Sequence, residues 1–310
     1  MSSRRTFAVA LAALAGAFVT GCGSGGAGDG QGNARTAVAT TTQVADLARA
    51  VAGERAEVRQ ILQPNSDPHE YEPRPSDVKA VTGAAVVLRS GGGLDDWLDG
   101  VVDNAGSDAK ITTLIDVVRT RRGADGVDPH WWQDPRNAIA AVGRIRDVMI
   151  AADPAGRSAY TANAAAYVGR LRGLDRAIAG CMRSIRPARR ILVTDHDALG
   201  PYAERYGIEV VGTVIPALST QAQASAGEVA RLVRTIRDTG VRTIFPARSA
   251  SAKLARAVAR DAGAGVGPAL FADTLGPAGG AGATYIDSLR VNTRALAAGF
   301  GGGAGTACQL

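Results

Sequence analysis

The chain has 310 residues, of which 46% are apolar, and its 35 basic side chains slightly outnumber its 29 acidic ones, giving a formal net charge of +6. This length and apolar content exclude a disordered chain or a very small domain, and they predict a large core divided between about two domains of roughly 100–200 residues. Because the two charge signs are interspersed along the chain, nucleic acid is not an expected partner.

The N-terminal segment has the pattern of an export signal. Arg4 and Arg5 precede an apolar run at residues 7–19, which is too short to span the roughly 30 Å of a bilayer core. The sequence VTGC at residues 19–22 resembles the bacterial lipobox, in which the cysteine is lipidated and becomes the first residue after cleavage. An ordinary signal peptide followed by a chance cysteine is the alternative.

We therefore expect a signal peptide at residues 1–21, lipidation of Cys22 and a flexible, lipid-anchored linker at residues 22–36. These features predict an extracytoplasmic protein that is attached to the bacterial cell membrane by its N-terminal lipid. The paired arginines leave both the general secretory route and the twin-arginine route open.

Short apolar runs alternate with amphipathic stretches from residue 37 onward. The expected strands lie at residues 37–41, 58–62, 85–88 and 111–114, with helices at 44–52, 75–82 and 95–104. A second series has strands at residues 190–194, 209–213, 243–245 and 269–272, with helices at 199–206, 224–239, 252–261 and 285–298. Alternation of this kind predicts βα units and parallel sheets, so we expect two lobes, at residues 37–153 and 188–300.

Between the two series, residues 135–185 contain no strand-like run and have apolar side chains at helical spacing. The pattern breaks near Asp153 and Pro154, and a helix over the following 30 residues would be roughly 45 Å long. We therefore predict an α/β fold in which a connecting helix at residues 154–187 joins the two lobes. A ligand would then bind in the cleft where the carboxyl ends of the two sets of strands face each other.

All three histidines of the chain lie in loops near predicted strand ends. His69 follows the second strand of the first series, His130 precedes the connecting region, and His196 follows the first strand of the second series. One exposed loop histidine is usually only solvated, but three at such positions favour a metal site, for which neutral imidazole is a common ligand. Asp273 follows the apolar run at residues 269–272 and is the candidate carboxylate, although the side chains of Asp67, Glu72, Asp195 and Asp197 are alternatives.

Four motifs together resemble the metal-binding solute receptors of bacterial zinc and manganese ABC importers, the cluster A-I substrate-binding lipoproteins. The motifs are DPHEYEP at residues 67–73, HWWQDP at 130–135, DHDALGPYAERYG at 195–207 and DTLG at 273–276, the last followed by Tyr285. The resemblance covers residues 37–300 and implies two βα lobes, joined by a long rigid helix, that clamp one divalent cation. It implies metal ligation by His69 and His130 of the first lobe and by His196 and Asp273 of the second.

Two features depart from the family pattern. Residues 71–129 contain no histidine, so the histidine-rich metal-collecting loop of many zinc receptors is absent from this sequence. Ala247 stands where relatives often have a glutamate after a strand, so a contribution of that carboxylate to the surroundings of the metal or to its release is not expected.

Three imidazoles and one carboxylate suit tetrahedral zinc. Manganese receptors of the family more often have glutamate in place of the third histidine, so His196 favours zinc. The metal is expected to be the transported ligand, and manganese is the alternative. The resemblance implies delivery to an ABC importer permease by a protein that is expected to be a monomer. A metal-dependent surface adhesin is a further alternative, and a zinc hydrolase is disfavoured because His69-Glu70 lacks the second histidine of the helical metalloprotease motif. We therefore expect no enzymatic activity.

Cys181 and Cys308 remain as a pair after Cys22 receives its lipid. In an exported protein they can form a disulfide that ties a flexible tail at residues 301–310 to a helix, and a buried free Cys181 with an unpaired Cys308 is the equally weighted alternative. The adjacent Trp131 and Trp132 are expected to pack beside His130, and the glycines at residues 91–93 to form a tight strand-to-helix turn.

Overall fold

The structure, a computed structural model, describes residues 36–107, 109–123, 126–301, 308 and 310, which belong to the unit Gly32–Leu310 of the chain. The expected signal peptide, the expected lipidation site Cys22 and the expected linker as far as residue 35 lie outside the described residues. Among the residues described, no helix combines the length and the apolar character needed to cross a bilayer.

The first lobe contains a four-stranded parallel sheet with the strand order β2-β1-β3-β4. Its strands are β1 (Thr36–Ala39), β2 (Glu57–Gln60), β3 (Val86–Arg89) and β4 (Lys110–Thr113), and its connecting helices are α1 (Thr42–Ala52), α2 (Pro75–Val81) and α3 (Leu98–Ala105). The apolar side chains of the central strands β1 and β3 are buried, which explains why these strands read as short continuous apolar runs.

The second lobe repeats this architecture with the strand order β10-β9-β7-β8, again parallel throughout. Its strands are β7 (Ile191–Thr194), β8 (Glu209–Thr213), β9 (Thr243–Phe245) and β10 (Gly265–Val266), and its helices are α6 (Gly200–Tyr206), α7 (Ala226–Thr239), α8 (Lys253–Ala262) and α9 (Tyr285–Gly299). The predicted fold class, two parallel-sheet lobes joined by a long helix, is therefore confirmed.

The strand predicted at residues 269–272 is wrong. The edge strand is β10, four residues earlier, and Leu270 forms only an isolated parallel bridge with Ala247. Pro268 and Pro246 interrupt the pairing because proline has no backbone N–H to donate. The chain beyond them runs beside the extension of β9 as a loop, which carries Asp273 to the carboxyl edge of the sheet.

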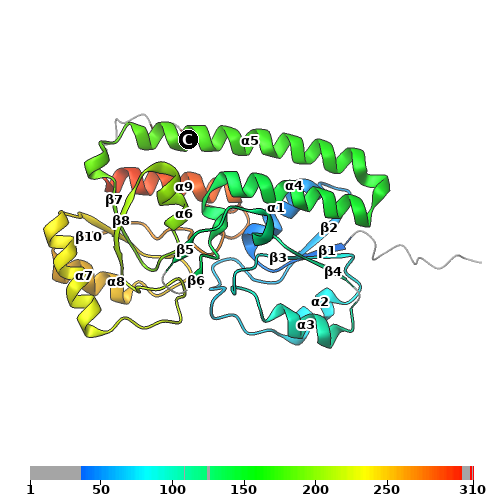
Figure 1. The fold of residues 1–310 in the computed structure, drawn as a ribbon, viewed down its shortest axis with the longest axis horizontal. Coiled ribbons are helices and arrows are strands. Elements are labelled where there is room, and N and C mark those ends of the chain that lie inside the picture. Colours follow the sequence, from blue (N-terminus) through cyan, green and yellow to red (C-terminus); the bar gives the residue numbers. More distant parts are fainter. Residues whose placement is uncertain (1–35, 108, 124–125, 302–307, 309) are drawn as a thin grey trace, which may run out of the picture. The chain divides into compact units, whose positions relative to one another are not determined.

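Two helices connect the lobes: α4 (Pro135–Ala152) and the 27-residue α5 (Arg157–Arg183). At 1.5 Å per residue, α5 is about 40 Å long. Figure 1 shows that it runs past both lobes, above α4 and α9. The predicted break between the two helices occurs at Asp153, which accepts two hydrogen bonds from the Arg55 guanidinium and one from Tyr160.

The lobes share a continuous apolar core. One cluster of buried side chains includes Leu47 of α1, Ile145 of α4, Leu171 of α5 and Leu289 of α9. A smaller cluster lies on the other face of each sheet, under α2 and α3 in the first lobe and under α7 and α8 in the second. The connecting helices therefore belong to the core of both lobes.

Short elements that the sequence patterns did not reveal lie between the first sheet and α4. They are the 3₁₀ turns η1 (Ile115–Val117) and η2 (Trp131–Gln133) and an antiparallel hairpin of β5 (Arg122–Gly123) and β6 (Gly126–Val127). Two further 3₁₀ turns, η3 (Pro154–Gly156) and η4 (Pro187–Arg189), flank α5. Two-residue strands are too short to produce a recognisable alternation of apolar and polar side chains.

The glycines at residues 91–93 form the expected tight turn after β3. All three have positive φ angles, between 75° and 89°, which residues other than glycine rarely adopt. Buried Asp95 holds the turn by accepting hydrogen bonds from the backbone N–H groups of Ser90 and Gly91.

A disulfide joins Cys181, which is buried on α5, to Cys308, with 4.7 Å between the two Cα atoms. Cys308 and Leu310 are partly buried against the main core. The end of the chain therefore lies on α5, where the disulfide attaches it.

Candidate metal centre

The structure brings together the three histidines and the aspartate named from the sequence. His69 lies in the loop after β2, His130 directly precedes η2, His196 follows β7, and Asp273 follows the chain beyond β10. In both sheets the strand order reverses next to the first strand of the lobe, β1 or β7, and ligands of α/β proteins bind at such switch points.

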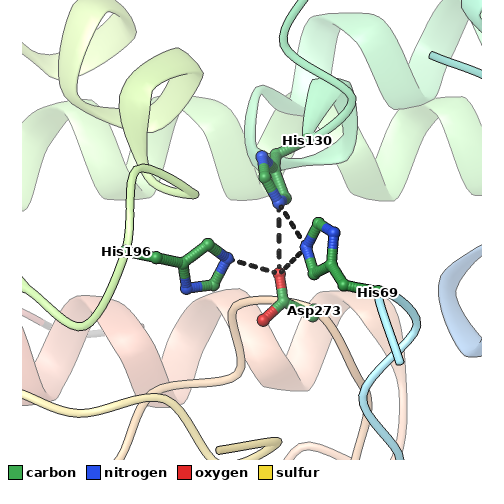
Figure 2. Close-up of side chains that lie close together, drawn as sticks. All are labelled: His69, His130, His196 and Asp273. Carbon is green, nitrogen blue, oxygen red and sulfur yellow. Dashed lines mark hydrogen bonds and ion pairs between the residues drawn. The ribbon is translucent and has the colours of Figure 1, made fainter. Parts of the chain in front are cut away.

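The four side chains converge on one point, as Figure 2 shows. One ligand atom from each residue can be chosen so that all four atoms lie within 4.8 Å of one another. The Asp273 Oδ1 atom lies 3.3 Å from the Nε2 atoms of both His130 and His196, and 3.9 Å from the Nε2 atom of His69. The Nε2 atoms of His69 and His130 are 3.3 Å apart.

These separations fit a small cation with four ligands. Ligands at about 2.1 Å from a tetrahedral zinc ion lie roughly 3.4 Å from one another, close to three of the observed distances. Asp273 Oδ1 and the Nε2 atom of His196, which lie 3.3 Å apart, are buried atoms without a hydrogen-bond partner. Unpartnered buried polar atoms that face one another are costly, and a bound cation would satisfy them.

The site is shielded from solvent on all sides. The side chain of His69 is 5% exposed, and those of the other three residues are 0–1% exposed. Burial lowers the pKa of His69 to about 3, so this imidazole is neutral at physiological pH. Burial also opposes the charged form of His130, but the hydrogen bond to Asp128 and the negative charge of the nearby Asp273 outweigh it and raise the pKa of His130 to about 9.

The electrostatics of the centre favour one positive charge beside Asp273. Burial alone would raise the pKa of the Asp273 carboxyl, but the neighbouring His196 and His130 rings lower it well below its usual value. The aspartate is therefore ionised, and without metal the proton on His130 balances it. A divalent cation at the same place would replace that proton.

Two copies of the sequence Asp-Pro-His build the first-lobe half of the centre. In each copy the backbone N–H of the histidine donates to the Oδ1 atom of the aspartate two residues earlier, at 3.0 Å for His69 and Asp67 and at 2.9 Å for His130 and Asp128. Such a local turn orients the histidine before any long-range contact forms.

Asp128 also fixes the ring of His130. The Nδ1 atom of His130 donates to Asp128 Oδ1 at 2.8 Å, which leaves Nε2 directed toward the centre. A carboxylate behind a ligating histidine sets the tautomer and makes the ring a stronger metal ligand. This role of Asp128 was not predicted from the sequence, although the repeated Asp-Pro-His motif was a signal that pointed to it.

In the second lobe, Ser249 donates to Asp273 Oδ2 at 2.9 Å, which leaves Oδ1 free to face the histidines. Sequence reasoning missed Ser249, because no motif marks it. Ala247 is buried and pairs with Leu270, so this position contributes no side-chain ligand.

The four alternative carboxylates do not belong to this group of side chains. Asp67 accepts a hydrogen bond from Thr220, Asp197 pairs with Arg121, and Glu72 is exposed. The Oδ2 atom of Asp195 lies 3.9 Å from the Nδ1 atom of His196, behind the ring rather than in the centre.

The two tryptophans lie beside the centre as expected. The ring of Trp132 packs at a steep angle against His130, with 5.4 Å between the ring centroids, and Trp131 packs against Trp132. The indole N–H of Trp132 donates to the backbone carbonyl of Ala272 at 2.9 Å, directly beside Asp273. The aromatic pair therefore excludes water and connects the loops that carry two of the four side chains.

Proteins of known sequence match most of the chain. It is 32% identical over 258 residues to the manganese-binding lipoprotein MntA of Halalkalibacterium halodurans, a match that covers 82% of this chain and 85% of the relative. It is 29% identical over 268 residues to the iron-binding protein YfeA of Yersinia pestis, with 85% and 86% covered.

Solved structures match equally widely. The periplasmic zinc-binding protein TroA from Treponema pallidum superposes with a TM-score of 0.81 at 25% identity, covering 86% of this chain and 99% of TroA. A manganese-bound periplasmic metal-binding protein from Candidatus Liberibacter asiaticus has the same fold, with a TM-score of 0.78 at 22% identity and the same shares covered.

The family model described as "Zinc-uptake complex component A periplasmic" matches residues 37–299, which include both lobes, the connecting helices and all four converging side chains. The chain therefore belongs to the ZnuA family, the metal-binding substrate-binding proteins of ABC importers.

Proposed function

We propose that this protein captures zinc outside the cytoplasm and delivers it to the membrane permease of an ABC importer, with His69, His130, His196 and Asp273 as the metal ligands. The observation that carries the proposal is the convergence of three imidazole nitrogens and one carboxylate oxygen, buried between two lobes. The family consists of solute receptors and not of enzymes, and four protein ligands leave no coordination position for an activated water.

Zinc is proposed because the donor set is rich in nitrogen and spaced for four-coordination. Manganese prefers a harder set with more oxygen ligands. It is the second candidate because a relative at 32% identity is named as a manganese-binding lipoprotein. The affinity of nitrogen sites rises along the divalent series toward copper and zinc, so a direct competition between ions decides the question.

The N-terminal features support the proposed location. Residues 19–22 match the pattern of a lipidation site, and several relatives are named as lipoproteins. We propose that the mature chain begins at a lipidated Cys22, that residues 22–36 form the linker to the membrane, and that residues 37–153, 154–187 and 188–300 form the first lobe, the connecting helix and the second lobe. A single copy contains all four ligands, so the proposed working form is a monomer.

The test is a metal titration of the mature protein without a histidine tag, beginning with metal content and followed by competition between zinc and manganese. His196→Ala should lower zinc affinity by more than about 100-fold, since loss of an outer partner alone costs 10–100-fold. Asp238→Ala, an exposed acid on α7, is the matched control and should leave the affinity unchanged.

Tighter binding of manganese than of zinc would mean that manganese is the transported ion, and the proposed role as a metal receptor would still hold. Equal affinities of His196→Ala and the control would overturn the site. Growth in zinc-depleted medium of a strain that lacks the gene separates import from adhesion. If the protein serves in import, the wild-type gene should restore growth and the His196→Ala gene should not.

A further inference from the structure

We propose that Arg121 is a positioning residue that links the orientation of His130 to the second lobe and thereby slows release of the metal. The inference rests on the proposed metal capture. It concerns a side chain that lies between two carboxylates, Asp128 of the first lobe and Asp197 of the second.

The first contact lies at the base of the β5–β6 hairpin. Arg121 and Asp128 are opposite each other just outside the paired strands, and the Asp128 N–H donates to the Arg121 carbonyl at 2.9 Å. The Arg121 Nε atom is 3.2 Å from Asp128 Oδ2. The other carboxylate oxygen of Asp128 holds the Nδ1 atom of His130, so Arg121 supports His130 through a single intervening side chain.

The second contact crosses to the other lobe. A terminal nitrogen of Arg121, Nη2, donates to Asp197 Oδ2 at 2.8 Å. Asp197 is adjacent in sequence to His196, and its own N–H is held by the Ala217 carbonyl at 3.0 Å. Arg121 therefore joins the segments that carry one proposed ligand from each lobe, using two different nitrogens of the same guanidinium.

The fold leaves a space of defined shape for this guanidinium. Gly200, the first residue of α6, lies against it: a Cβ atom on Gly200 would come within 1.5 Å of Arg121 Nη1 and within 2.2 Å of Arg121 Cζ. Glycine is not required there by backbone conformation, because its φ angle is not positive. The absence of a side chain at Gly200 is explained by the place that Arg121 occupies.

The burial of the contacts makes the link strong. The Asp128 side chain is fully buried, whereas those of Arg121 and Asp197 are 28% and 27% exposed. A buried carboxylate with a charged partner responds strongly to the loss of that partner. Any separation of the lobes would break the contact between Arg121 and Asp197, so that Asp128 alone would hold the guanidinium. The support that Asp128 gives to His130 would then weaken.

A neighbouring ion pair provides a matched control. Arg119 pairs with Glu204 of α6 at 3.8 Å, also between the lobes, but both side chains are mostly exposed. Exposed pairs of this kind contribute little. Comparison of the two arginines separates a positioning role from a general effect of charge between the lobes.

The experiment measures the rate constant of metal release from zinc-loaded mature protein mixed with excess chelator. Arg121→Gln should release zinc about 10-fold faster than wild type, the lower end of the range for loss of a ligand's direct partner, because Arg121 acts through Asp128. Arg121→Lys should restore slow release at most in part, since an ammonium lacks the fixed planar pair of N–H groups, Nε and Nη2, with which the guanidinium contacts the two carboxylates. Gly200→Ala should reproduce the fast release without any change of charge.

The controls are Arg119→Gln and Gly143→Ala, the latter at a helical glycine whose Cβ would meet no atom within 4 Å. Both should release zinc at the wild-type rate. In a double-mutant cycle, Asp197→Asn should have little further effect once Arg121→Gln is present. A purely structural role would lower the melting temperature of the metal-free variants without changing the release rate.

Wild-type release rates in Arg121→Gln and Gly200→Ala, or additive effects in the cycle, would overturn this inference. Failure of the proposed function has a different signature: the wild-type protein would bind no metal, or His196→Ala would bind it as tightly as wild type does.

Discussion

A single aspartate, Asp273, organises the charge of the metal centre. It is fully buried, one of its oxygens is held by Ser249, and the other faces three imidazoles. A carboxylate in this position requires a positive charge nearby, which is either the proton on His130 or a bound cation. Capture of a metal ion at this site would therefore exchange a proton for a cation.

This exchange predicts a pH dependence of affinity. The pKa of His130 is raised to about 9, so the metal-free protein keeps the proton at neutral pH, whereas His69, with its pKa near 3, is already neutral. Metal affinity should therefore rise as pH increases toward about 9 and weaken as pH falls, by about tenfold per pH unit for each proton displaced. Calorimetric titration in buffers of different ionisation enthalpy should show about one proton released per zinc at pH 7.5.

The stability of the metal-free protein should respond in the opposite direction. A raised histidine pKa contributes stability that is fully present below about pH 6.5, the pKa of an unfolded histidine, and is lost as pH rises through about 9.

A metal affinity that stays flat between about pH 7.5 and 5.5 would contradict the assignment of imidazole ligands.

Among single residues, the sequence was most informative about the proposed ligands and least informative about the side chains that hold them in place. With only three histidines in the chain, their positions at strand ends were enough to suggest one site, and the motif around Asp273 selected it among several acids. Asp128, Ser249 and Arg121 act through contacts with residues that fold beside them, and a single sequence does not show which side chains will meet.

The ends of the strands determine where the proposed ligands lie. His69 and His196 each follow a parallel strand, and parallel strands present their carboxyl ends at one edge of the sheet. The apolar runs of β1, β3 and β7 predicted these edges well. The apolar run at residues 269–272 predicted a strand that does not form, because prolines at 246 and 268 prevent regular pairing. Its side chains are apolar because they are buried, although the segment is a loop.

The disulfide on α5 leads to a prediction about stability. It closes a loop with a sequence separation of 127 residues, and a disulfide across a long loop typically stabilises a protein by about 2–4 kcal/mol. Replacing both Cys181 and Cys308 by serine should lower the free energy of unfolding in urea by about that amount. Adding a reductant to the wild type should have a similar effect.

Thiol labelling of the unreduced mature protein provides the control for this experiment. No reactive thiol should be found at either position after denaturation. Two labelled thiols, at Cys181 and Cys308, would show that the bridge is absent from the protein in solution.

In the whole molecule, each lobe provides two of the four side chains of the centre. The Trp132 side chain of the first lobe bonds the Ala272 carbonyl of the second, and the Leu275 N–H bonds the Thr42 hydroxyl of the first, at 2.9 Å in both cases. A metal ion bound by two ligands from each lobe would add to these contacts. Because it binds only the folded arrangement, it should stabilise the protein by mass action.

Zinc should therefore raise the melting temperature. At a free concentration 100 times the dissociation constant, the gain is about 2.7 kcal/mol, and each kcal/mol shifts the melting temperature of a protein approaching this size by about 2–4 °C. We expect an increase of roughly 5–10 °C in a thermal scan. His196→Ala should show almost no increase at the same zinc concentration, and an equal increase in that variant would mean that the ion binds elsewhere.

The core that passes through α4, α5 and α9 has a consequence for the cooperativity of the molecule. Leu192 of the second sheet and Ala39 of the first belong to the same buried cluster, to which both connecting helices contribute. Neither sheet has a complete core without those helices, so a chain cut between the lobes would expose apolar surface on both fragments. Despite its two sheets, residues 36–301 should melt in a single transition, and the two halves should be unable to exchange with those of a relative as independent modules.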